Sequence, residues 1–333
     1  MTNSAPDWHQ GMVRAAQANF YRVWQPSGQE WLCTRRARLQ KIGQTVLVGD
    51  HVWFSLSGER GVIEAVLPRR SWLTRPAVAN ADQALVIFAL ADPPLDPVPL
   101  SRFLVQVEAS GLQVQVCLNK RDLVADTEAE RWIQRLQSWG YSPLMVSAVT
   151  GEGLIDLRQC CQGKISVVTG ISGVGKSTLL NHLVPGLTLQ TNAVSGRLRH
   201  GQHTTRHVEL YPFPGSGWIA DTPGFNQVTL EFCQPQRLLS YFPEVRHLDQ
   251  HCQFQDCQHD QEPGCAVRQY NWERYPYYLD YLLELTANQG SLNPTESTLK
   301  TRSGRGSIPR LASRYRQTSR RSQRQGPMED TDE

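Results

Sequence analysis

Eight consecutive residues form the clearest chemical motif in this chain. Gly170-Ile171-Ser172-Gly173-Val174-Gly175-Lys176-Ser177 matches G-x-x-x-x-G-K-[ST] at every fixed position. An apolar strand is expected before it, at residues 165–169, and a helix after it, at 176–183. Glycines let successive backbone N–H groups face a phosphate, and the helix N-terminus adds partial positive charge. The motif predicts a nucleoside triphosphate site in which Lys176 reaches the β- and γ-phosphates and Ser177 ligates Mg²⁺.

Two further motifs indicate which base the site binds. Asn119-Lys120-Arg121-Asp122 follows the expected buried strand 114–118 and reads N-K-x-D. The carboxylate of Asp122 accepts hydrogen bonds from the N1–H and exocyclic amine of guanine, a donor pair that adenine lacks. Ser147-Ala148 ends the next expected strand, where GTPases place another loop that contacts the base. The sequence therefore predicts a guanine nucleotide.

A third motif completes the phosphate site and reveals an unusual order. Asp221-Thr222-Pro223-Gly224 ends the expected strand 218–220 and matches D-x-x-G, whose Asp holds Mg²⁺ and whose Gly N–H meets the γ-phosphate. In most GTPases N-K-x-D follows D-x-x-G, but here it precedes the phosphate loop. The order predicts a circularly permuted domain. The segment after Gly224 then connects the nucleotide site directly to the C-terminal part of the chain.

The segment between the two phosphate motifs supplies candidates for sensing and hydrolysing the γ-phosphate. Gly201-Gln202-His203-Thr204-Thr205 occupies the position of switch I, where a Thr senses the γ-phosphate through Mg²⁺; we choose Thr205 over Thr204. Phe225 stands where Ras-like enzymes carry the Gln that orients water, so another group must act. His203 is the candidate catalytic residue, and the alternative is an exposed loop histidine without that role.

A cluster of soft ligands lies near the C-terminal end of the folded part. Cys252-x₄-Cys257-x-His259-x₅-Cys265 offers three thiolates and one imidazole, a set that binds Zn²⁺ tetrahedrally. Four protein ligands leave no open coordination position, so we expect one structural zinc ion. His251 could compete with His259 as a ligand, but it directly neighbours Cys252. Free thiols, or a redox role for them, are the alternatives.

The elements that must position these motifs alternate between strand and helix. Strands are expected at 84–90, 114–118, 144–147 and 165–169, and helices at 99–110, 127–139, 154–160 and 176–183. This alternation predicts a doubly wound α/β domain. Residues 11–70 contain short β-branched and aromatic runs separated by glycines, which predict a small β-barrel. Residues 236–290 are rich in aromatic side chains and contain the cysteines of the cluster.

The charge of the chain is unevenly distributed. The net charge is +3, from 34 basic and 31 acidic residues, but nine basic and no acidic residues lie between Lys300 and Arg324. Residues 1–296 therefore carry a net charge of −2. The longest apolar run, Ala84–Ala91, is far shorter than the ~20 residues that a membrane span needs. No secretory signal is visible, and eight scattered or clustered cysteines indicate a reducing cytosol rather than a disulfide scaffold.

Taken with their order, these motifs resemble the RsgA/YjeQ family of circularly permuted bacterial GTPases. The resemblance covers about residues 11–290 and includes NKRD, GISGVGKST, GQHTTR, DTPGF and the zinc motif with its Glu262-Pro263-Gly264. It implies an N-terminal OB-fold, a central permuted P-loop GTPase and a mainly helical zinc domain. Their expected boundaries are 1–75, 76–235 and 236–290, followed by a disordered basic tail at 291–333. Family members often carry G-R-H-T-T, where this chain has Gln202.

The resemblance also implies a set of site residues. The expected GTP-binding residues are Asn119, Lys120, Arg121, Asp122, Ser147, Ala148, Gly170, Ile171, Ser172, Gly173, Val174, Gly175, Lys176, Ser177, Thr178 and Gly224. The expected Mg²⁺ ligands are Ser177, Thr205 and Asp221, and the zinc ligands are Cys252, Cys257, His259 and Cys265.

The implied function is GTP hydrolysis, stimulated by the 30S ribosomal subunit and its 16S rRNA, in late assembly of that subunit. We expect a cytoplasmic monomer that has no contact with membranes. One alternative is a nucleotide-switched RNA- or protein-binding factor that does not act on the ribosome. Another is a structural RNA-binding protein with a degenerate nucleotide site, which the intact Lys176, Ser177, Asp221 and Asp122 argue against. The basic tail is either an arm that binds rRNA or a solvated terminus.

Overall fold

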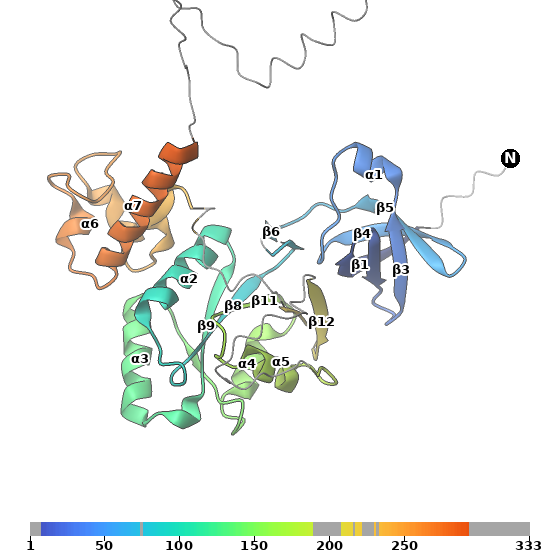
Figure 1. The fold of residues 1–333 in the computed structure, drawn as a ribbon, viewed down its shortest axis with the longest axis horizontal. Coiled ribbons are helices and arrows are strands. Elements are labelled where there is room, and N and C mark those ends of the chain that lie inside the picture. Colours follow the sequence, from blue (N-terminus) through green and yellow to red (C-terminus); the bar gives the residue numbers. More distant parts are fainter. Residues whose placement is uncertain are drawn as a thin grey trace, which may run out of the picture. The chain divides into compact units, whose positions relative to one another are not determined.

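The parts of the chain that carry the fold are residues 8–73, 76–188, 208–215, 217–221, 230 and 233–292, which the computed structural model describes. Contacts divide the chain into one unit that ends at Leu282 and a second that begins at Leu283. Within the described residues, no helix is both long and apolar enough to cross a bilayer. Figure 1 shows the helices and strands, coloured from blue at the N-terminus to red at the C-terminus.

The first five strands form a closed barrel (Figure 1). Strand β1 pairs with β2 and β4, β2 with β3, β3 with β5 in parallel, and β5 with β4, so the ladder of hydrogen bonds returns to its start. The inward-facing side chains Val13, Val23, Phe54 and Ile63 are fully buried. The bounds are β1 (Trp8–Gln17), β2 (Phe20–Trp24), β3 (Glu30–Arg35), β4 (His51–Ser57) and β5 (Arg60–Val66).

A short helix, α1 (Ala37–Lys41), follows β3 and lies in the segment that the sequence analysis singled out only as basic. Its Leu39 is buried in the barrel core, while Arg38 and Lys41 are exposed. Two-residue strands β6 (Trp72–Leu73) and β7 (Val78–Ala79) pair with each other after the barrel. They lead into the central sheet.

The central sheet is parallel over five of its six strands. Its order is β10-β9-β8-β11-β13-β12, and only β12 runs antiparallel to its neighbour. The strands are β8 (Gln83–Ala89), β9 (Gln113–Asn119), β10 (Leu144–Met145), β11 (Ile165–Thr169), β12 (Glu209–Phe213) and β13 (Gly217–Asp221). Every residue of β8 and β11 is buried, which explains why their sequences are mainly apolar, with Gln83, Ser166 and Thr169 as the polar residues.

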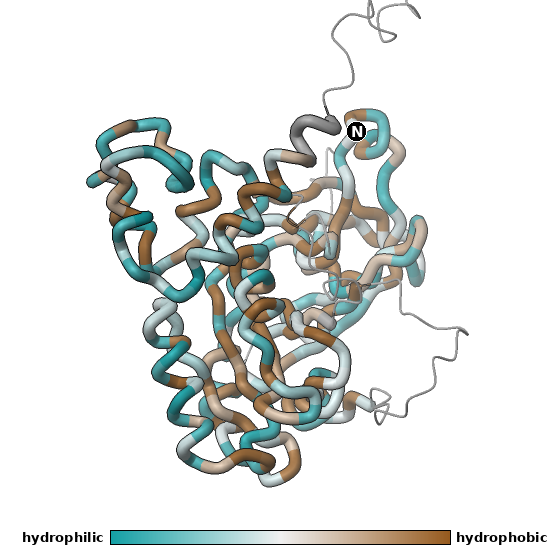
Figure 2. The backbone as a smooth tube through the Cα atoms, turned by 60° about the vertical axis from the view of Figure 1, so that its left-hand side comes forward, coloured by the Kyte–Doolittle hydropathy of each residue, from teal (hydrophilic) through white to brown (hydrophobic). Residues whose placement is uncertain are grey.

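Helices cover both faces of this sheet. On one face, α2 (Pro97–Ser110) and α3 (Asp126–Ser138) pack on Ala84, Val86 and Phe88 of β8. On the other, α4 (Leu154–Cys161) and α5 (Lys176–Leu183) pack on the alternate residues Leu85 and Ile87. Figure 2 shows hydrophobic residues along the inner strands and hydrophilic residues along the outer helices and loops. The three-layer α/β arrangement agrees with the predicted fold class.

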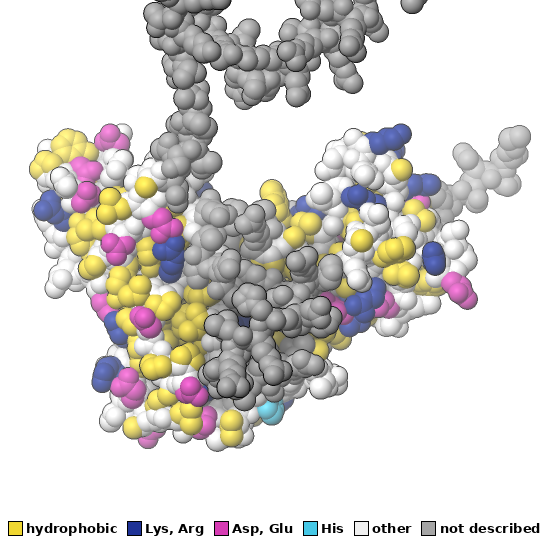
Figure 3. Space-filling model, in the orientation of Figure 1, with side chains coloured by type: hydrophobic (Ala, Val, Ile, Leu, Met, Phe, Trp, Pro, Cys, Tyr) yellow, Lys and Arg dark blue, Asp and Glu magenta, His cyan; other side chains and the backbone are white. Residues whose placement is uncertain are grey.

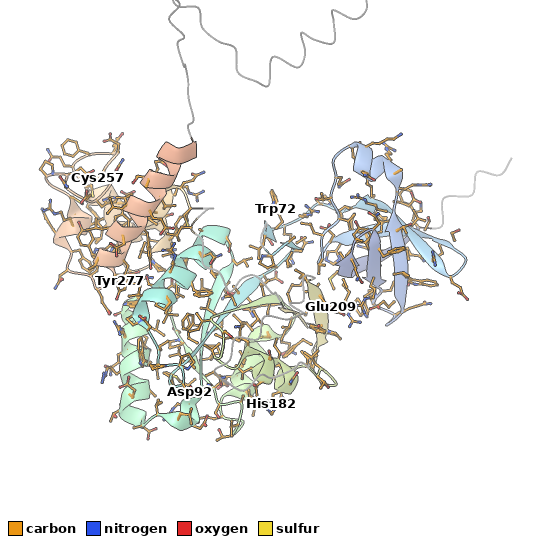
Figure 4. All side chains as sticks on the ribbon, viewed as in Figure 1. Trp72, Asp92, His182, Glu209, Cys257 and Tyr277 are labelled. Carbon is orange, nitrogen blue, oxygen red and sulfur yellow. The ribbon has the colours of Figure 1, made fainter. Side chains whose placement is uncertain are left out.

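Strand β12 links the central sheet to the barrel through β1, where Ala15 lies opposite Glu209. The Glu209 carboxylate accepts hydrogen bonds from Arg22, at 2.8 Å, and from Arg14, at 3.4 Å. Figure 4 labels this glutamate. The indole rings of Trp24 and Trp218 meet edge to face 4.9 Å apart. Strand β12 was not expected from the sequence, because its Pro212 and short length hide a strand pattern.

The C-terminal part of the first unit is built from short helical turns and one longer helix. They are the 3₁₀ helices η2 (Pro235–Tyr241) and η3 (Arg246–His251), and the α-helices α6 (Ala266–Gln269) and α7 (Tyr275–Leu292), which continues past Leu282. Arg274 is fully buried here and forms a bidentate ion pair with Glu244. Its guanidinium lies 4.7 to 5.7 Å from the ring centres of Trp139, Tyr141 and Phe242.

Candidate functional site

The predicted nucleotide-binding motifs meet at one edge of the central sheet. Because β9, β10 and β11 are parallel, their carboxyl ends lie side by side, and each end carries a motif. Asn119 ends β9, Ser147 follows β10 and Gly170 follows β11. Asp221 ends β13, which is parallel to β11. Ligands of open α/β sheets bind outside this edge.

The phosphate loop has the backbone conformation that its glycines allow. Gly170 has φ +145° and lies so close to β8 that a Cβ atom would come within 2.0 Å of the carbonyl oxygen of Ile87. Gly175 has φ +91°, and a Cβ atom there would lie 2.4 Å from the side-chain nitrogen of Asn119. Helix α5 then begins at Lys176, with Ser177 and Thr178 in its first turn. The remaining predicted loop residues, Ile171, Ser172, Gly173 and Val174, lie between the two glycines.

Lys176 extends along this loop. Its Nζ donates hydrogen bonds to the carbonyl oxygens of Gly170 at 2.8 Å and Ile171 at 2.7 Å. These contacts hold the ammonium group beside the loop. A positive charge there is suited to an anionic ligand at the start of α5.

One buried amide joins three of the predicted segments. The Nδ2 of Asn119 donates to the carbonyl oxygen of Val174, at 2.8 Å, and its Oδ1 accepts from the N–H of Ala148, at 3.4 Å. Asn119 is 2% exposed, so each of these hydrogen bonds is protected from water. The N-K-x-D segment 119–122, the segment 147–148 and the predicted phosphate loop are therefore fixed relative to one another.

The side chain that is expected to read the base is also oriented. The Ser147 hydroxyl donates to Asp122 Oδ1, at 2.5 Å, and accepts from the Thr150 N–H, at 3.1 Å. Asp122 remains exposed at the protein surface, so its carboxylate is accessible to a ligand. A carboxylate held in one orientation discriminates between bases better than a freely rotating one.

The other two residues of the N-K-x-D motif have partners on neighbouring loops. Lys120 has a left-handed backbone with φ +61°, and its Nζ donates to the carbonyl oxygen of Asp92, which follows β8. Its Nζ also lies 3.8 Å from Asp92 Oδ2. Figure 4 labels Asp92 at this edge of the sheet. Arg121 forms ion pairs with Asp126 and Glu152, which direct its guanidinium toward α3 and the loop before α4.

Several predicted residues lie outside the part of the chain that the structure describes. The candidate catalytic His203, the switch I residue Thr205 and the D-x-x-G residue Gly224 are among them. Asp221 is described only by its backbone, as the last residue of β13. The roles of these residues stay predictions.

The four predicted metal ligands converge on one point. The donor atoms of Cys252, Cys257, His259 and Cys265 all lie within 4.8 Å of one another. His259 Nδ1 is 3.6 Å from the Cys252 sulfur and 3.5 Å from the Cys265 sulfur, and these two sulfurs are 3.9 Å apart. A tetrahedral site with Zn–S bonds of about 2.3 Å places its sulfurs about 3.8 Å apart. The donor set and spacing therefore fit a structural metal ion, and His251 is not part of the set.

Contacts outside the ligand set support this geometry. Asp249 Oδ1 lies 3.2 Å from His259 Nε2, so a carboxylate orients the ring with Nδ1 toward the sulfurs. Burial lowers the pKa of His259, which favours the neutral imidazole that binds metals. The Arg268 N–H donates to the Cys265 sulfur, at 3.3 Å. Asp249 was not predicted as part of this site, since its only signal in the sequence is a carboxylate ten residues before the histidine.

Aromatic hydroxyls hold the loop between the ligands. The Tyr278 hydroxyl donates to the carbonyl oxygen of Gln258 at 2.7 Å, and that of Tyr275 donates to the carbonyl oxygen of His259 at 3.0 Å. The Glu262 carboxylate accepts from the N–H groups of Gln258 and Asp260. Figure 4 labels Cys257 within this region.

Comparison with known proteins identifies the family. The family model described as RsgA GTPase matches residues 66–231. A protein of Thermosynechococcus vestitus named small ribosomal subunit biogenesis GTPase RsgA is 49% identical, over 95% of this chain and 94% of its own length. The chain belongs to the RsgA GTPase family. A family member of the same name from Synechocystis sp. is 46% identical over 95% of this chain and 93% of its own length.

Solved structures of related proteins agree with this fold. YjeQ from Thermotoga maritima superposes with a TM-score of 0.74 and 31% identity, over 84% of this chain and 99% of its own. YloQ, described as a circularly permuted GTPase, superposes with a TM-score of 0.71 and 31% identity, over 86% and 98%. The predicted fold class, including the barrel, the permuted GTPase domain and the C-terminal Cys/His region, is confirmed.

Proposed function

We propose that this chain is a GTPase that binds the 30S ribosomal subunit and assists its late assembly, hydrolysing GTP to GDP and phosphate with turnover that the subunit stimulates. The observation that carries the proposal is the Asn119 amide, which joins the base-reading and phosphate-binding loops into one site. The relatives named for small-subunit biogenesis match almost the whole chain, which supports the ribosomal target.

Guanine is recognised by Asp122. Its carboxylate accepts hydrogen bonds from the N1–H and the exocyclic amine of the base, while Ser147 keeps it in position. The N–H of Ala148, already turned toward the Asn119 side chain, belongs to the loop that borders the base. Adenine presents no matching pair of donors, and a carboxylate without hydrogen-bond partners is costly.

The phosphates are bound by the loop from Gly170 to Thr178. Lys176 exchanges its contacts with loop carbonyls for the β- and γ-phosphate oxygens. Ser177, Thr205 and Asp221 would hold Mg²⁺, which supplies positive charge to the γ-phosphate when it is bound. The Gly224 N–H contacts the γ-phosphate, and His203 orients the attacking water.

The cysteine cluster would hold one zinc ion with a structural role, because its four protein ligands fill a tetrahedral site. The barrel and this C-terminal region contact 16S rRNA, chiefly through phosphates and shape. The protein acts as a cytoplasmic monomer. Its domains are residues 1–75, 76–235 and 236–290, with the basic residues 291–333 as an arm that adds rRNA affinity.

The decisive experiment measures GTP hydrolysis with and without purified 30S subunits. We expect the subunits to raise the turnover rate and 50S subunits to leave it unchanged. Replacing Lys176 with Ala should abolish hydrolysis in both conditions. Absence of stimulation by 30S subunits would contradict the ribosomal target, whereas turnover by the Lys176 variant would contradict the site assignment.

Base recognition has its own test in Asp122→Asn. The asparagine amide matches xanthine, whose 2-oxo group accepts a hydrogen bond where guanine donates one. The variant should lose at least about 100-fold in GTP affinity and gain affinity for xanthosine triphosphate. Unchanged preference for GTP would show that Asp122 does not read the base.

A further inference from the structure

The barrel has a hollow beside the first residues that leave it. The hollow has a volume of about 400 Å³ and is lined by Gln44, Val66, Leu67, Pro68, Arg69 and Trp72. This volume is within the range of about 300–1,000 Å³ in which proteins hold small ligands or single groups of larger ones. No residue of the nucleotide site or of the cysteine cluster contributes to it.

Trp72 is an exposed aromatic residue that the fold does not require. In strand β6 its neighbour Leu73 points into the core and is 6% exposed, while the Trp72 side chain points outward and is 64% exposed. Figure 4 shows Trp72 projecting from β6. An indole ring exposed beside a hollow offers a flat apolar surface for another planar group.

Arg69 supplies a second planar wall, and its position is fixed. Its Nε and Nη2 donate to the two oxygens of the fully buried Asp50, at 2.7 and 2.9 Å, and Nη2 also donates to the carbonyl oxygen of Thr45. Arginine planes stack on nucleobases as aromatic rings do. Gln44 brings an amide that can both donate and accept hydrogen bonds.

Exposed cations lie on the short helix that precedes the hollow in the chain. Helix α1 ends three residues before Gln44 and exposes Arg38 and Lys41. Arg70, next to the hollow, is largely exposed but is balanced by an ion pair with Asp82 at 3.1 Å. Figure 3 shows lysine and arginine side chains over the barrel, with a few carboxylates among them. Cations around an apolar hollow suit a group that carries both a flat base and a phosphate.

We propose that this hollow binds one unpaired nucleotide of an RNA strand, with the base against Trp72 and Arg69 and the backbone phosphates near Arg38 and Lys41. The inference rests on the proposed function, in which the natural RNA is part of the 30S subunit. Unpaired bases are the usual targets of aromatic and guanidinium platforms, because duplex bases are already stacked.

The test compares Trp72→Ala, Trp72→Phe and the matched control Trp8→Ala, since Trp8 is also exposed on the barrel but does not line the hollow. Binding is measured to a labelled single-stranded RNA nonamer and to 30S subunits, after thermal unfolding has shown that each variant is folded. We expect Trp72→Ala to weaken both by about 5- to 100-fold, Trp72→Phe to retain most of the affinity, and Trp8→Ala to have no effect.

The possible outcomes separate this proposal from the function on which it rests. Equal RNA binding by the wild type and Trp72→Ala would overturn the nucleotide-binding hollow, even if 30S subunits still stimulate hydrolysis. If the wild type does not bind the RNA nonamer but Trp72→Ala still loses binding to 30S subunits, the nucleotide-binding hollow would also be overturned. The hollow would then bind a protein of the subunit. Failure of the wild type to bind 30S subunits, with RNA binding intact and dependent on Trp72, would contradict the proposed function alone.

Discussion

The nucleotide site and the cysteine cluster are stabilised in different ways. The predicted nucleotide site (residues 119–122, 147–148 and 170–178) depends on main-chain conformation, with glycines at positive φ and one amide between loops. The cysteine cluster (Cys252, Cys257, His259 and Cys265) lies in short turns, where four side chains converge in a set that fits a structural metal ion. A sheet edge can therefore preform a site through its backbone, whereas a region without a sheet needs a cross-link between side chains.

The largest effect should come from removing the metal. A strong zinc chelator, or Cys252→Ser, should unfold the turns from residue 233 to 282, because metal binding supplies about 10–16 kcal/mol in small zinc-dependent folds. Near-ultraviolet circular dichroism should lose the signal of its buried tyrosines and Trp272, while affinity for fluorescent GDP is retained. Cys160→Ser, at a half-buried cysteine outside the cluster, serves as the control. Parallel loss of GDP binding would show that the two regions are not independent.

A smaller effect should follow from Arg274→Met. This change leaves the Glu244 carboxylate buried without its partner, which costs about 3–5 kcal/mol, and it removes the guanidinium from between aromatic rings. Urea unfolding measures the loss, with Arg237→Met as a control at an exposed arginine of the same region. If Arg274→Met lowers the free energy of unfolding no more than Arg237→Met does, aromatic packing alone stabilises this C-terminal region.

The nucleotide site should be sensitive to a single methyl group. Gly175→Ala places a Cβ atom against Asn119 and requires a left-handed backbone that costs roughly 1–2 kcal/mol. We expect GDP affinity to fall at least about tenfold, which corresponds to about 1.4 kcal/mol. Gly163→Ala is the matched control, because it has φ +72° but open space around it. Equal affinities of the two variants would show that the Asn119 contact is dispensable.

The smallest expected effect is on the pH dependence of stability, through the carboxyl group of Glu108, which lies where α2 approaches the C-terminal region. Burial raises the pKa of Glu108, and Tyr141 donates a hydrogen bond to its carboxylate at 3.2 Å. The folded state therefore favours the protonated acid, and its contribution to stability is lost as pH rises through the raised pKa. Glu108→Gln should be slightly more stable than the wild type at pH 7 and equal to it near pH 4 in urea unfolding. The control Glu130→Gln, at an exposed position, should have the same stability as the wild type at both pH values. If Glu108→Gln were more stable than the wild type at pH 4 instead of at pH 7, the direction of the Glu108 pKa shift would be wrong.

The sequence predicted the central sheet well because its strands are buried on both faces. Continuous apolar runs such as Ala84–Leu90 and fixed-spacing motifs at strand ends both follow from local geometry. Strand β12 was missed because it is short and contains Pro212, and its pairing with β1, between residues 194 positions apart, leaves no local signal. The Asp249 contact with His259 and the Arg274–Glu244 pair also depend on tertiary packing. Neither has a sequence pattern of its own.

The Asn119 amide has a consequence for how such a protein can be rearranged or divided. The loops that it joins are 29 and 55 residues away along the chain, and they meet through hydrogen bonds instead of through covalent continuity. New termini at an exposed turn, for example near Gly163, therefore leave these contacts in place. Two fragments cut there should reassemble around a bound guanine nucleotide. The permuted order of the motifs is therefore a rearrangement that leaves the contacts between these loops, and hence the stability of the site, largely unchanged.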